Sequence, residues 1–310
     1  MKIVFMGTPD FSVGALESLI EAGHEIAAVV TQPDKKKGRG GQVQYTPVKE
    51  AALKHNLAVY QPVRARDEEF VNVLREIAPD VIVVVAFGQI LPKSILELAP
   101  YGCINIHASL LPRYRGAAPI QWAVIDGEEK TGVTTQQMNE GIDTGDILET
   151  IEVLIDKKET GGSLFDKLSD AGAKLIVQTL ENIKEGNIHP VPQDDSKSNY
   201  AKMLTKDLGN IDFSKTAAEI ERLIRGLNPW PSAYTKFRGK TLKIWDADIV
   251  TDNEYAGIPG QIVDFDKTCF YVKTGEGCLR INELQLEGKK RMETEAFLLG
   301  NKLEKGEILG

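Results

Sequence analysis

The sequence is poor in the residues that cross-link small proteins or bind metals. Its three cysteines, Cys103, Cys269 and Cys278, are widely spaced and form no Cys-x-x-Cys pair. This spacing argues against a disulfide framework and against a structural zinc site, so we predict no bound metal. Cys103 can in principle act as a nucleophile, but we interpret all three cysteines as small buried apolar residues.

Long apolar stretches are also missing. No run reaches the length of about 18 apolar residues that suggests a membrane-spanning helix. The N-terminal strand meets Gly7 before the apolar core of a signal peptide can form, so we expect a cytoplasmic protein. Of the 310 residues, 42% are hydrophobic and 26% are charged, which is sufficient for a sizeable core. Single cores stop growing near about 250–300 residues, and we therefore predict two domains.

The common phosphate-binding and hydrolase motifs are absent as well. The first predicted strand ends in Gly7-Thr8-Pro9-Asp10, which does not match G-x-G-x-x-G. The sequence also contains no P-loop, no H-E-x-x-H and no G-x-S-x-G motif. A dehydrogenase or a nucleotide hydrolase would lack its usual phosphate cradle, and both classes are excluded.

The net charge of −8 argues at first sight against a nucleic-acid partner. Two segments depart from this average. Residues 31–50 hold five Lys and Arg against two Asp and Glu, and residues 203–245 hold eight against four. Because screening confines electrostatic attraction to about 10 Å, a ligand responds to the local charge more than to the total. The pattern fits a polyanion bound at two places, although two solvated loops would have the same composition.

The first half of the chain alternates predicted strands and helices. We predict strands at residues 2–6, 25–30, 80–86 and 102–106, and helices at residues 11–22, 46–55 and 67–77. The Val-Ile-Val-Val-Val run in 80–86 is apolar on both faces, which is typical of a parallel strand covered by helices. With strands at 132–138 and 147–154 and a long helix ending at Gly186, residues 1–188 form a predicted α/β domain. Its alternation indicates a doubly wound, Rossmann-like parallel sheet.

The pattern changes after this domain. Residues 189–205 are polar and punctuated by proline, which is the composition of a linker. Residues 206–310 form a predicted second domain, with one helix at 217–227 and about five short strands separated by turn residues. Short strands of this spacing indicate a small β-barrel.

Candidate catalytic residues lie at the end of the strand 102–106 and in a later turn. Asn105 and His107 are two residues apart, so their side chains project from the same face of a strand, beyond which ligands bind in open α/β sheets. The turn 141–146 adds Asp143 and Asp146. The same residue types also cap and form turns, so each motif alone is weak.

An amide, an imidazole and a carboxylate together suit direct transfer of an acyl group to an amine. Asn105 can donate a hydrogen bond to the oxygen on which negative charge develops. His107 can add a second donor as imidazolium or accept the proton of the amine, and the spacing leaves both roles open. A carboxylate would orient the imidazole ring, and the spacing equally leaves Asp143 and Asp146 open.

Longer motifs resemble the folate-dependent formyltransferases. The resemblance rests on Asn105-x-His107-x-Ser109-Leu110-Leu111-Pro112, Arg115-Gly116-Ala117-Ala118-Pro119-Ile120-Gln121 and Gly141-x-Asp143-Thr144-Gly145. Further matches are Met6-Gly7-Thr8-Pro9-Asp10-Phe11, Thr31-Gln32-Pro33-Asp34, Gly38-Arg39-Gly40 and Asn228-Pro229-Trp230-Pro231. These matches cover nearly the whole chain and are similar to the branch of the family that acts on initiator methionyl-tRNA.

The resemblance implies transfer of a formyl group from 10-formyltetrahydrofolate to the amine of methionine on initiator methionyl-tRNA. It implies that Asn105, His107 and Asp143 are catalytic, and that Ser109, Leu110, Leu111 and Pro112 bind folate. The second domain would be an OB-like barrel that binds tRNA. We expect a monomer. Two positions depart from the usual pattern, with Ala108 in place of glycine and Tyr114 in place of tryptophan.

Contacts to tRNA are predicted in two groups. The loop 35–42 matches the family's loop that enters the acceptor arm, and its cations are Lys35, Lys36, Lys37 and Arg39. Charge alone, without a motif, adds a group in the second domain, namely Lys206, Lys236, Arg238, Lys240 and Lys243.

Two other functions compete with tRNA formylation. A formyltransferase acting on a small amine, such as a purine precursor or an amino sugar, would share the Asn-His-Asp set. A non-catalytic RNA-binding protein would use only the barrel and the basic loop.

Overall fold

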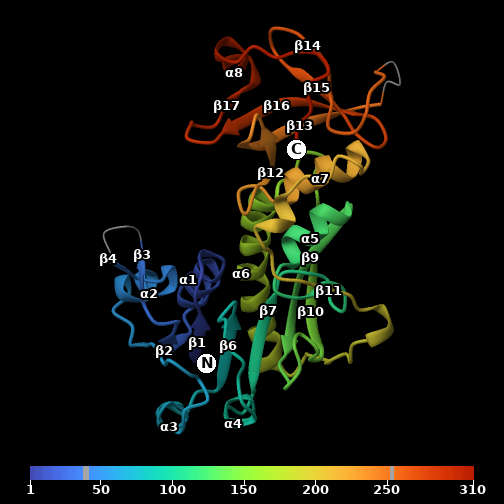
Figure 1. The fold of residues 1–310 in the computed structure, drawn as a ribbon. Helices are drawn as coiled ribbons and strands as arrows, with labels where there is room; N and C mark the ends of the chain where they lie inside the picture. The colour runs from blue at the N-terminus through green and yellow to red at the C-terminus, as the bar shows by residue number, and fades with distance from the viewer. Residues whose placement is uncertain (38–41, 252–254) are drawn as a thin grey trace. The chain divides into compact units, whose positions relative to one another are not determined.

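The first half of the chain forms a seven-stranded sheet, drawn in blue to green in Figure 1. This computed structural model describes residues 1–37, 42–251 and 255–310. The strand order is β10-β9-β7-β6-β1-β2-β5. The strands are β1 (Lys2–Gly7), β2 (Glu25–Val30), β5 (Val59–Tyr60), β6 (Val81–Val85), β7 (Cys103–His107), β9 (Lys130–Gln137) and β10 (Ile147–Leu154).

Five of these strands are parallel, as the sequence predicts. β1 pairs with β2 on one side and with β6 on the other, so the winding reverses between β1 and β6. β9 and β10 complete the sheet in antiparallel orientation, which the prediction of a parallel sheet did not include. They are antiparallel to each other because residues 138–146, which connect them, are too few for the crossover that parallel neighbours need.

Helices cover both faces of this sheet. They are α1 (Val13–Glu21), α2 (Pro47–Lys54), α3 (Glu68–Ile77), α4 (Lys93–Leu96) and α6 (Gly161–Glu185), and the short helix η1 (Asp10–Ser12) precedes α1. Gly172 of α6 lies against Ile106 of β7, and Ser169 Oγ of α6 donates a hydrogen bond to the Phe11 carbonyl at 3.1 Å. Phe70 of α3 and Ile95 of α4 share a buried cluster with Cys103 of β7. Residues 103 and 106 of one strand therefore face different helical layers.

Local sequence signals account for several helix boundaries. Thr46 caps α2 by accepting a hydrogen bond from the Lys49 amide at 3.2 Å, with Pro47 at the first helical position, as predicted. In the second half of the chain, α7 (Ala217–Gly226) begins with a capping box between Thr216 and Glu219.

The chain divides into two compact units. The first comprises Met1–Pro119, Lys130–Leu154 and Phe165–Ala201, and the second comprises Ile120–Glu129, Ile155–Leu164 and Lys202–Gly310. The predicted domain limits at residues 188 and 206 follow the sequence alone and remain predictions. None of the helices in the described ranges is long and apolar enough to cross a membrane.

The second unit contains a six-stranded antiparallel sheet with the order β12-β13-β16-β15-β14, and β17 pairs with β16. Its strands are β12 (Ala233–Phe237), β13 (Lys240–Val250), β14 (Ile262–Phe265), β15 (Phe270–Lys273), β16 (Cys278–Leu286) and β17 (Met292–Glu293), and α8 (Thr294–Gly300) follows them. Phe237 and Phe297 meet edge to face in the core at 5.6 Å between ring centroids. The predicted short strands therefore form a separate antiparallel sheet.

Several short elements have no counterpart in the sequence prediction. They are β3 (Lys35–Lys37), β4 (Gln42–Gln44), β8 (Arg115–Gly116), α5 (Pro119–Asp126), η2 (Asp195–Lys197), β11 (Tyr200–Ala201) and η3 (Asp207–Gly209), together with β5, α4, β17 and α8. Those of only two or three residues are too short for a hydrophobic period to mark them. The predicted lysine-rich loop thus contains the β3–β4 hairpin.

Candidate active site

A cavity of about 360 Å³ lies where β6 and β7 end, in the first unit. This is the carboxyl edge of the sheet, next to the point at which the winding reverses, where α/β sheets bind their ligands. Its lining comes from the segment after β6, the end of β7 and the turn between β9 and β10. The lining residues are Val84, Ala86, Phe87, Gly88, Gln89, Ile90, Leu91, Asn105, Gly116, Ala117, Met138, Asn139, Glu140, Gly141, Ile142, Asp143 and Tyr200.

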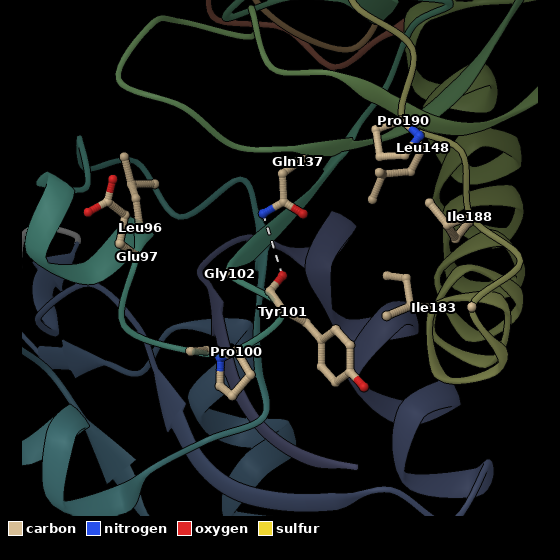
Figure 2. Close-up of a pocket in the computed structure, with 12 residues that line it drawn as sticks. Leu96, Glu97, Pro100, Tyr101, Gly102, Gln137, Leu148, Ile183, Ile188 and Pro190 are labelled. Carbon is tan, nitrogen blue, oxygen red and sulfur yellow. Dashed lines mark hydrogen bonds between the residues drawn. The ribbon is translucent and has the colours of Figure 1, made fainter.

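A second cavity, of about 530 Å³, opens at the other edge of the same sheet (Figure 2). Gly102 precedes β7 there, and Ile183 and Ile188 flank the end of α6. Figure 2 shows mostly apolar side chains around it, with the Gln137 amide directed at the Tyr101 carbonyl. None of the predicted catalytic residues lines this cavity. The smaller cavity is therefore the candidate active site.

Asn105 and His107 project from β7 on the same side, as the strand spacing predicts. They are 8% and 6% exposed. Asn105 lines the cavity, and within the described residues its side-chain amide has no hydrogen-bond partner. Its two N–H donors are therefore available to a bound ligand.

Asp143 lies in the turn between β9 and β10, with its carboxylate facing His107. The distance from Asp143 Oδ1 to His107 Nδ1 is 3.5 Å. Two donors fix the carboxylate: the Gln136 side-chain amide donates to Oδ1 at 3.0 Å, and the Gly116 backbone N–H donates to Oδ2 at 2.8 Å. The structure thus brings together the Asn, His and Asp of the sequence prediction. Asp146, the alternative acid, makes no such contact with His107 among the described residues.

The hydrogen bonds of the imidazole constrain its protonation. His107 Nε2 lies 2.9 Å from the Tyr114 carbonyl oxygen, which can only accept, so Nε2 carries a proton. A neutral ring would then turn the lone pair of Nδ1 toward the Asp143 carboxylate. The 3.5 Å approach is attractive when Nδ1 is also protonated. The ring therefore lies between a backbone acceptor and a carboxylate, and the two roles left open for His107 stay predictions.

Residues of two sequence motifs hold the loop after β6. Thr8 Oγ1 and Gln32 Nε2 both donate to the Phe87 carbonyl, each at 3.1 Å. The Gln89 side chain accepts from the Ala65 amide at 2.7 Å. The Gly7-Thr8-Pro9-Asp10 and Thr31-Gln32-Pro33-Asp34 segments thus act by shaping the wall of the cavity. This wall, residues 86–91, was missed at the sequence level, although its place directly after a buried central strand could have indicated it.

The predicted folate residues Ser109, Leu110, Leu111 and Pro112 lie in the loop after β7. Ser109 Oγ donates to the Arg113 carbonyl at 2.7 Å, and the Leu111 amide donates to Thr134 Oγ1 at 3.1 Å. Ser109 and Leu111 are buried, and none of the four residues lines the cavity. Their part in folate binding stays a prediction.

Four predicted tRNA contacts lie on the β12–β13 hairpin of the second unit. Lys236 and Lys240 are exposed, and Lys236 Nζ donates to Thr241 Oγ1 at 2.9 Å. Arg238 pairs with Glu307 at 2.7 Å, and Lys243 Nζ lies 5.5 Å from the Trp245 ring centroid. Lys206 is exposed beside η3.

The other predicted tRNA contacts belong to the first unit. Lys35 is exposed, and the backbone of Lys36 and Lys37 continues the strand β3. Arg39 lies outside the described residues.

Cys103, considered above as a nucleophile, is buried at the start of β7. Its Sγ donates to the Ile95 carbonyl at 3.5 Å. Burial raises the pKa of the Cys103 thiol to about 12, so the thiol stays protonated near neutral pH. Among the described residues, no three His, Cys, Asp or Glu side chains are placed to hold a metal ion.

Comparison with known families and proteins places the chain among the formyltransferases. Residues 1–180 match the formyl transferase family model, and residues 203–302 match the model of the formyl transferase C-terminal domain. A methionyl-tRNA formyltransferase from Lachnospira eligens is 60% identical over the whole of both chains. A methionyl-tRNA formyltransferase from Clostridioides difficile is 51% identical, again over the whole of both.

Solved structures of lower identity share the fold. An N-formyltransferase from Helicobacter canadensis, complexed with folinic acid and dTDP-3-aminofucose, superposes with a TM-score of 0.68 at 19% identity, covering 94% of this chain and all of that one. HypX from Aquifex aeolicus with tetrahydrofolic acid gives a TM-score of 0.64 at 18% identity, covering all of this chain and 50% of that one. Through its two family-model matches and its full-length relatives, the chain belongs to the methionyl-tRNA formyltransferase family.

Proposed function

We propose that this protein transfers the formyl group of 10-formyltetrahydrofolate to the amine of methionine on initiator methionyl-tRNA. The observation that carries the proposal is identity of 60% and 51% to methionyl-tRNA formyltransferases over the full length of both chains. The cationic β12–β13 hairpin of the second unit also suits a polyanionic acceptor such as tRNA. Since charged initiator tRNA is a cytoplasmic molecule in bacteria, the proposal also places the reaction in the cytoplasm.

The cavity fits a reduced folate. Its volume of about 360 Å³ is in the usual range for a small-molecule site. Phe87, Ile90 and Ile142 supply apolar wall, and Asn105, Asn139 and Asp143 supply polar side chains around it. When bound, 10-formyltetrahydrofolate supplies the electrophilic formyl carbon. Among the residues that line the cavity, Asn105 and Asp143 belong to the predicted catalytic set.

Each catalytic residue has a distinct proposed role. The Asn105 amide donates a hydrogen bond to the formyl oxygen as negative charge develops on it. His107 lies between the Tyr114 carbonyl and Asp143 and is not among the residues that line the cavity. Its proposed role is to stabilise the same negative charge, as an imidazolium, through its electric field. Asp143 orients the ring and stabilises its charged form. In the loop that follows β7, Ser109, Leu110, Leu111 and Pro112 are proposed to bind the folate.

The proposed tRNA contacts form two separate groups, one on the β12–β13 hairpin of the second unit and one in the segment 35–42 with Arg39. Lysine and arginine contacts to phosphates release counterions, so the affinity for tRNA should fall steeply as salt rises. Substituting Arg39 by Ala should reduce transfer to tRNA more than it reduces binding of the folate.

The deciding experiment compares three amine acceptors. Purified protein with 10-formyltetrahydrofolate is assayed on initiator methionyl-tRNA, on an amino sugar nucleotide and on a purine-precursor amine. Formylation of the tRNA alone supports the proposal, and efficient formylation of a small amine without the tRNA refutes it. Tight tRNA binding with no transfer, unchanged in His107→Ala, would indicate a non-catalytic RNA-binding protein.

A further inference from the structure

The segment between the two family-model matches carries a residue that the motifs do not include. The first match ends at residue 180 and the second begins at residue 203. Within this interval, residues 191–201 of the first unit run along the catalytic turn and the loop after β7. Val191 bridges Ile147, and Tyr200 and Ala201 of β11 pair with Arg115 and Gly116 of β8. We call residues 191–201 the strap.

Gln193 is the strap residue whose side chain reaches the catalytic turn. Its Nε2 donates to the Asp143 carbonyl at 2.9 Å and to the Gly145 carbonyl at 2.7 Å. Its Oε1 accepts from Arg115 Nε at 3.0 Å and from Arg115 Nη2 at 2.8 Å. All four hydrogen bonds that a glutamine amide can make are therefore used inside the protein.

The contacts of Gln193 connect both elements that place the Asp143 carboxylate. On one side, Gln193 fixes the backbone of the turn at residues 143 and 145. On the other side, it fixes Arg115, which is 8% exposed, and the neighbouring Gly116 amide donates to Asp143 Oδ2. The Gln193 amide thus links the backbone of Asp143 to Arg115. Arg115 directly precedes Gly116, whose amide binds the Asp143 carboxylate.

The backbone of Asp143 needs such support. Its φ is +53°, in the left-handed region that non-glycine residues adopt only at an energetic cost. Residues in this region persist when the surrounding structure determines them. Gln193 holds the carbonyl of this residue itself and the carbonyl of Gly145, two residues further on, and so keeps the turn closed.

We propose that Gln193 is a positioning residue of the active site, which keeps the Asp143 carboxylate directed at His107. The proposal rests on the proposed formyl transfer for its kinetic consequences. Asp195 also contacts Arg115, at 2.8 Å, but its side chain is 83% exposed and the pair should contribute little. The glutamine, and not the ion pair, therefore carries the connection.

Substitution by Ala and by Glu separates the two halves of this contact. Gln193→Ala removes all four hydrogen bonds. Gln193→Glu keeps acceptors for Arg115 but turns oxygen atoms toward the Asp143 and Gly145 carbonyls, which can only accept. Both variants should lower kcat for methionyl-tRNA by about tenfold or more, with KM for the tRNA changed less than about twofold. Gln178→Ala is the matched control, because the Gln178 amide donates to Glu149 on a different part of the unit.

A second readout needs no substrate. The ring resonances of His107, recorded by NMR in the free protein, report the approach of the Asp143 carboxylate. They should shift in both Gln193 variants and remain in place in Gln178→Ala. Thermal unfolding midpoints identify any variant whose loss of activity follows from unfolding.

The outcomes separate this inference from the proposed function. Wild-type kcat in a folded Gln193→Ala or Gln193→Glu protein overturns the inference and leaves the function intact. Unmoved His107 resonances in both variants also overturn it. A wild-type protein that does not formylate methionyl-tRNA refutes the proposed function, and the NMR comparison then still decides whether Gln193 positions Asp143.

Discussion

Replacing Asp143 by Asn tests the proposed role of the carboxylate with the least structural disturbance. The two side chains have nearly the same shape, and Asn adopts the left-handed backbone at φ +53° as readily as Asp does. The turn should therefore keep its conformation. What changes is the negative charge and the identity of one of the two acceptor atoms.

The structure indicates how much this change should cost. Asp143 Oδ2 accepts from the Gly116 amide, whereas Oδ1 accepts from Gln136 and faces His107 Nδ1. If the Asn oxygen accepts from the Gly116 amide, its NH₂ group points toward the Gln136 amide and His107 Nδ1, which are donors themselves. In the reverse orientation the NH₂ group faces the Gly116 N–H. Two interactions with charged groups, each worth about 1.5–3 kcal/mol, are lost, which predicts a fall in kcat of about 10²- to 10⁴-fold.

Single-turnover formation of formyl-methionyl-tRNA, with enzyme in excess, measures this step directly. Asp146→Asn is the matched control, because it makes the same chemical change three residues away, without contact to His107. The control should keep wild-type rates. A folded Asp143→Asn enzyme within about tenfold of the wild type, or equal losses in both variants, would refute the role assigned to Asp143.

Three further predictions concern other parts of the structure. Asn105→Ala removes the donor to the formyl oxygen and should lower kcat by about 10²- to 10³-fold while KM for tRNA stays nearly constant, as steady-state kinetics would show. The peptide containing Cys103 should resist iodoacetamide at pH 8 in the folded protein, because its thiol has a pKa of about 12, and should react after denaturation, as mass spectrometry would detect. Hydrogen bonds from the Thr268 and Cys269 amides and the Thr268 hydroxyl lower the pKa of Asp266 from 3.8 to about 2, so its stabilising effect is present above pH 3.8 and lost as the pH falls toward 2. The difference in urea midpoint between the wild type and Asp266→Asn should therefore shrink as the pH falls from 3.8 toward 2. A difference that stays constant would contradict the lowered pKa of Asp266.

Much of the first unit follows from local patterns in the sequence. The Val81–Val85 strand is recognisable because every residue in it is apolar, and in the structure every one is buried. The Asn105 and His107 side chains share a face because strand geometry alternates, whatever the neighbouring strands do. Asp143 was one of two candidates, and only tertiary structure distinguishes it from Asp146 through the contact with His107.

Features formed by distant segments could not be predicted in the same way. The β8–β11 pair joins Arg115–Gly116 to Tyr200–Ala201, and two-residue strands show no period. The cavity wall at residues 86–91 depends on side chains from Thr8 and Gln32, which approach only when β1, β2 and β6 pair. The antiparallel pairing of β9 with β7 is likewise hidden, because the long connection between them, which contains α5, would also suit a parallel crossover.

The strap shows why composition misjudges such a segment. Most of its side chains are exposed and polar, so residues 189–205 have the average composition of a linker. Its bonds to the site are made by the backbone of Val191, Asn199 and Ala201 and by a few side chains, which are those of Gln193, Asp195 and Asn199. Backbone hydrogen bonds do not depend on residue type, and one glutamine among many polar residues does not alter an average. A polar segment can therefore determine the geometry of a catalytic turn without any sequence signal that separates it from a flexible connection. Its contribution is recognised only when the partner of each of its hydrogen bonds is known.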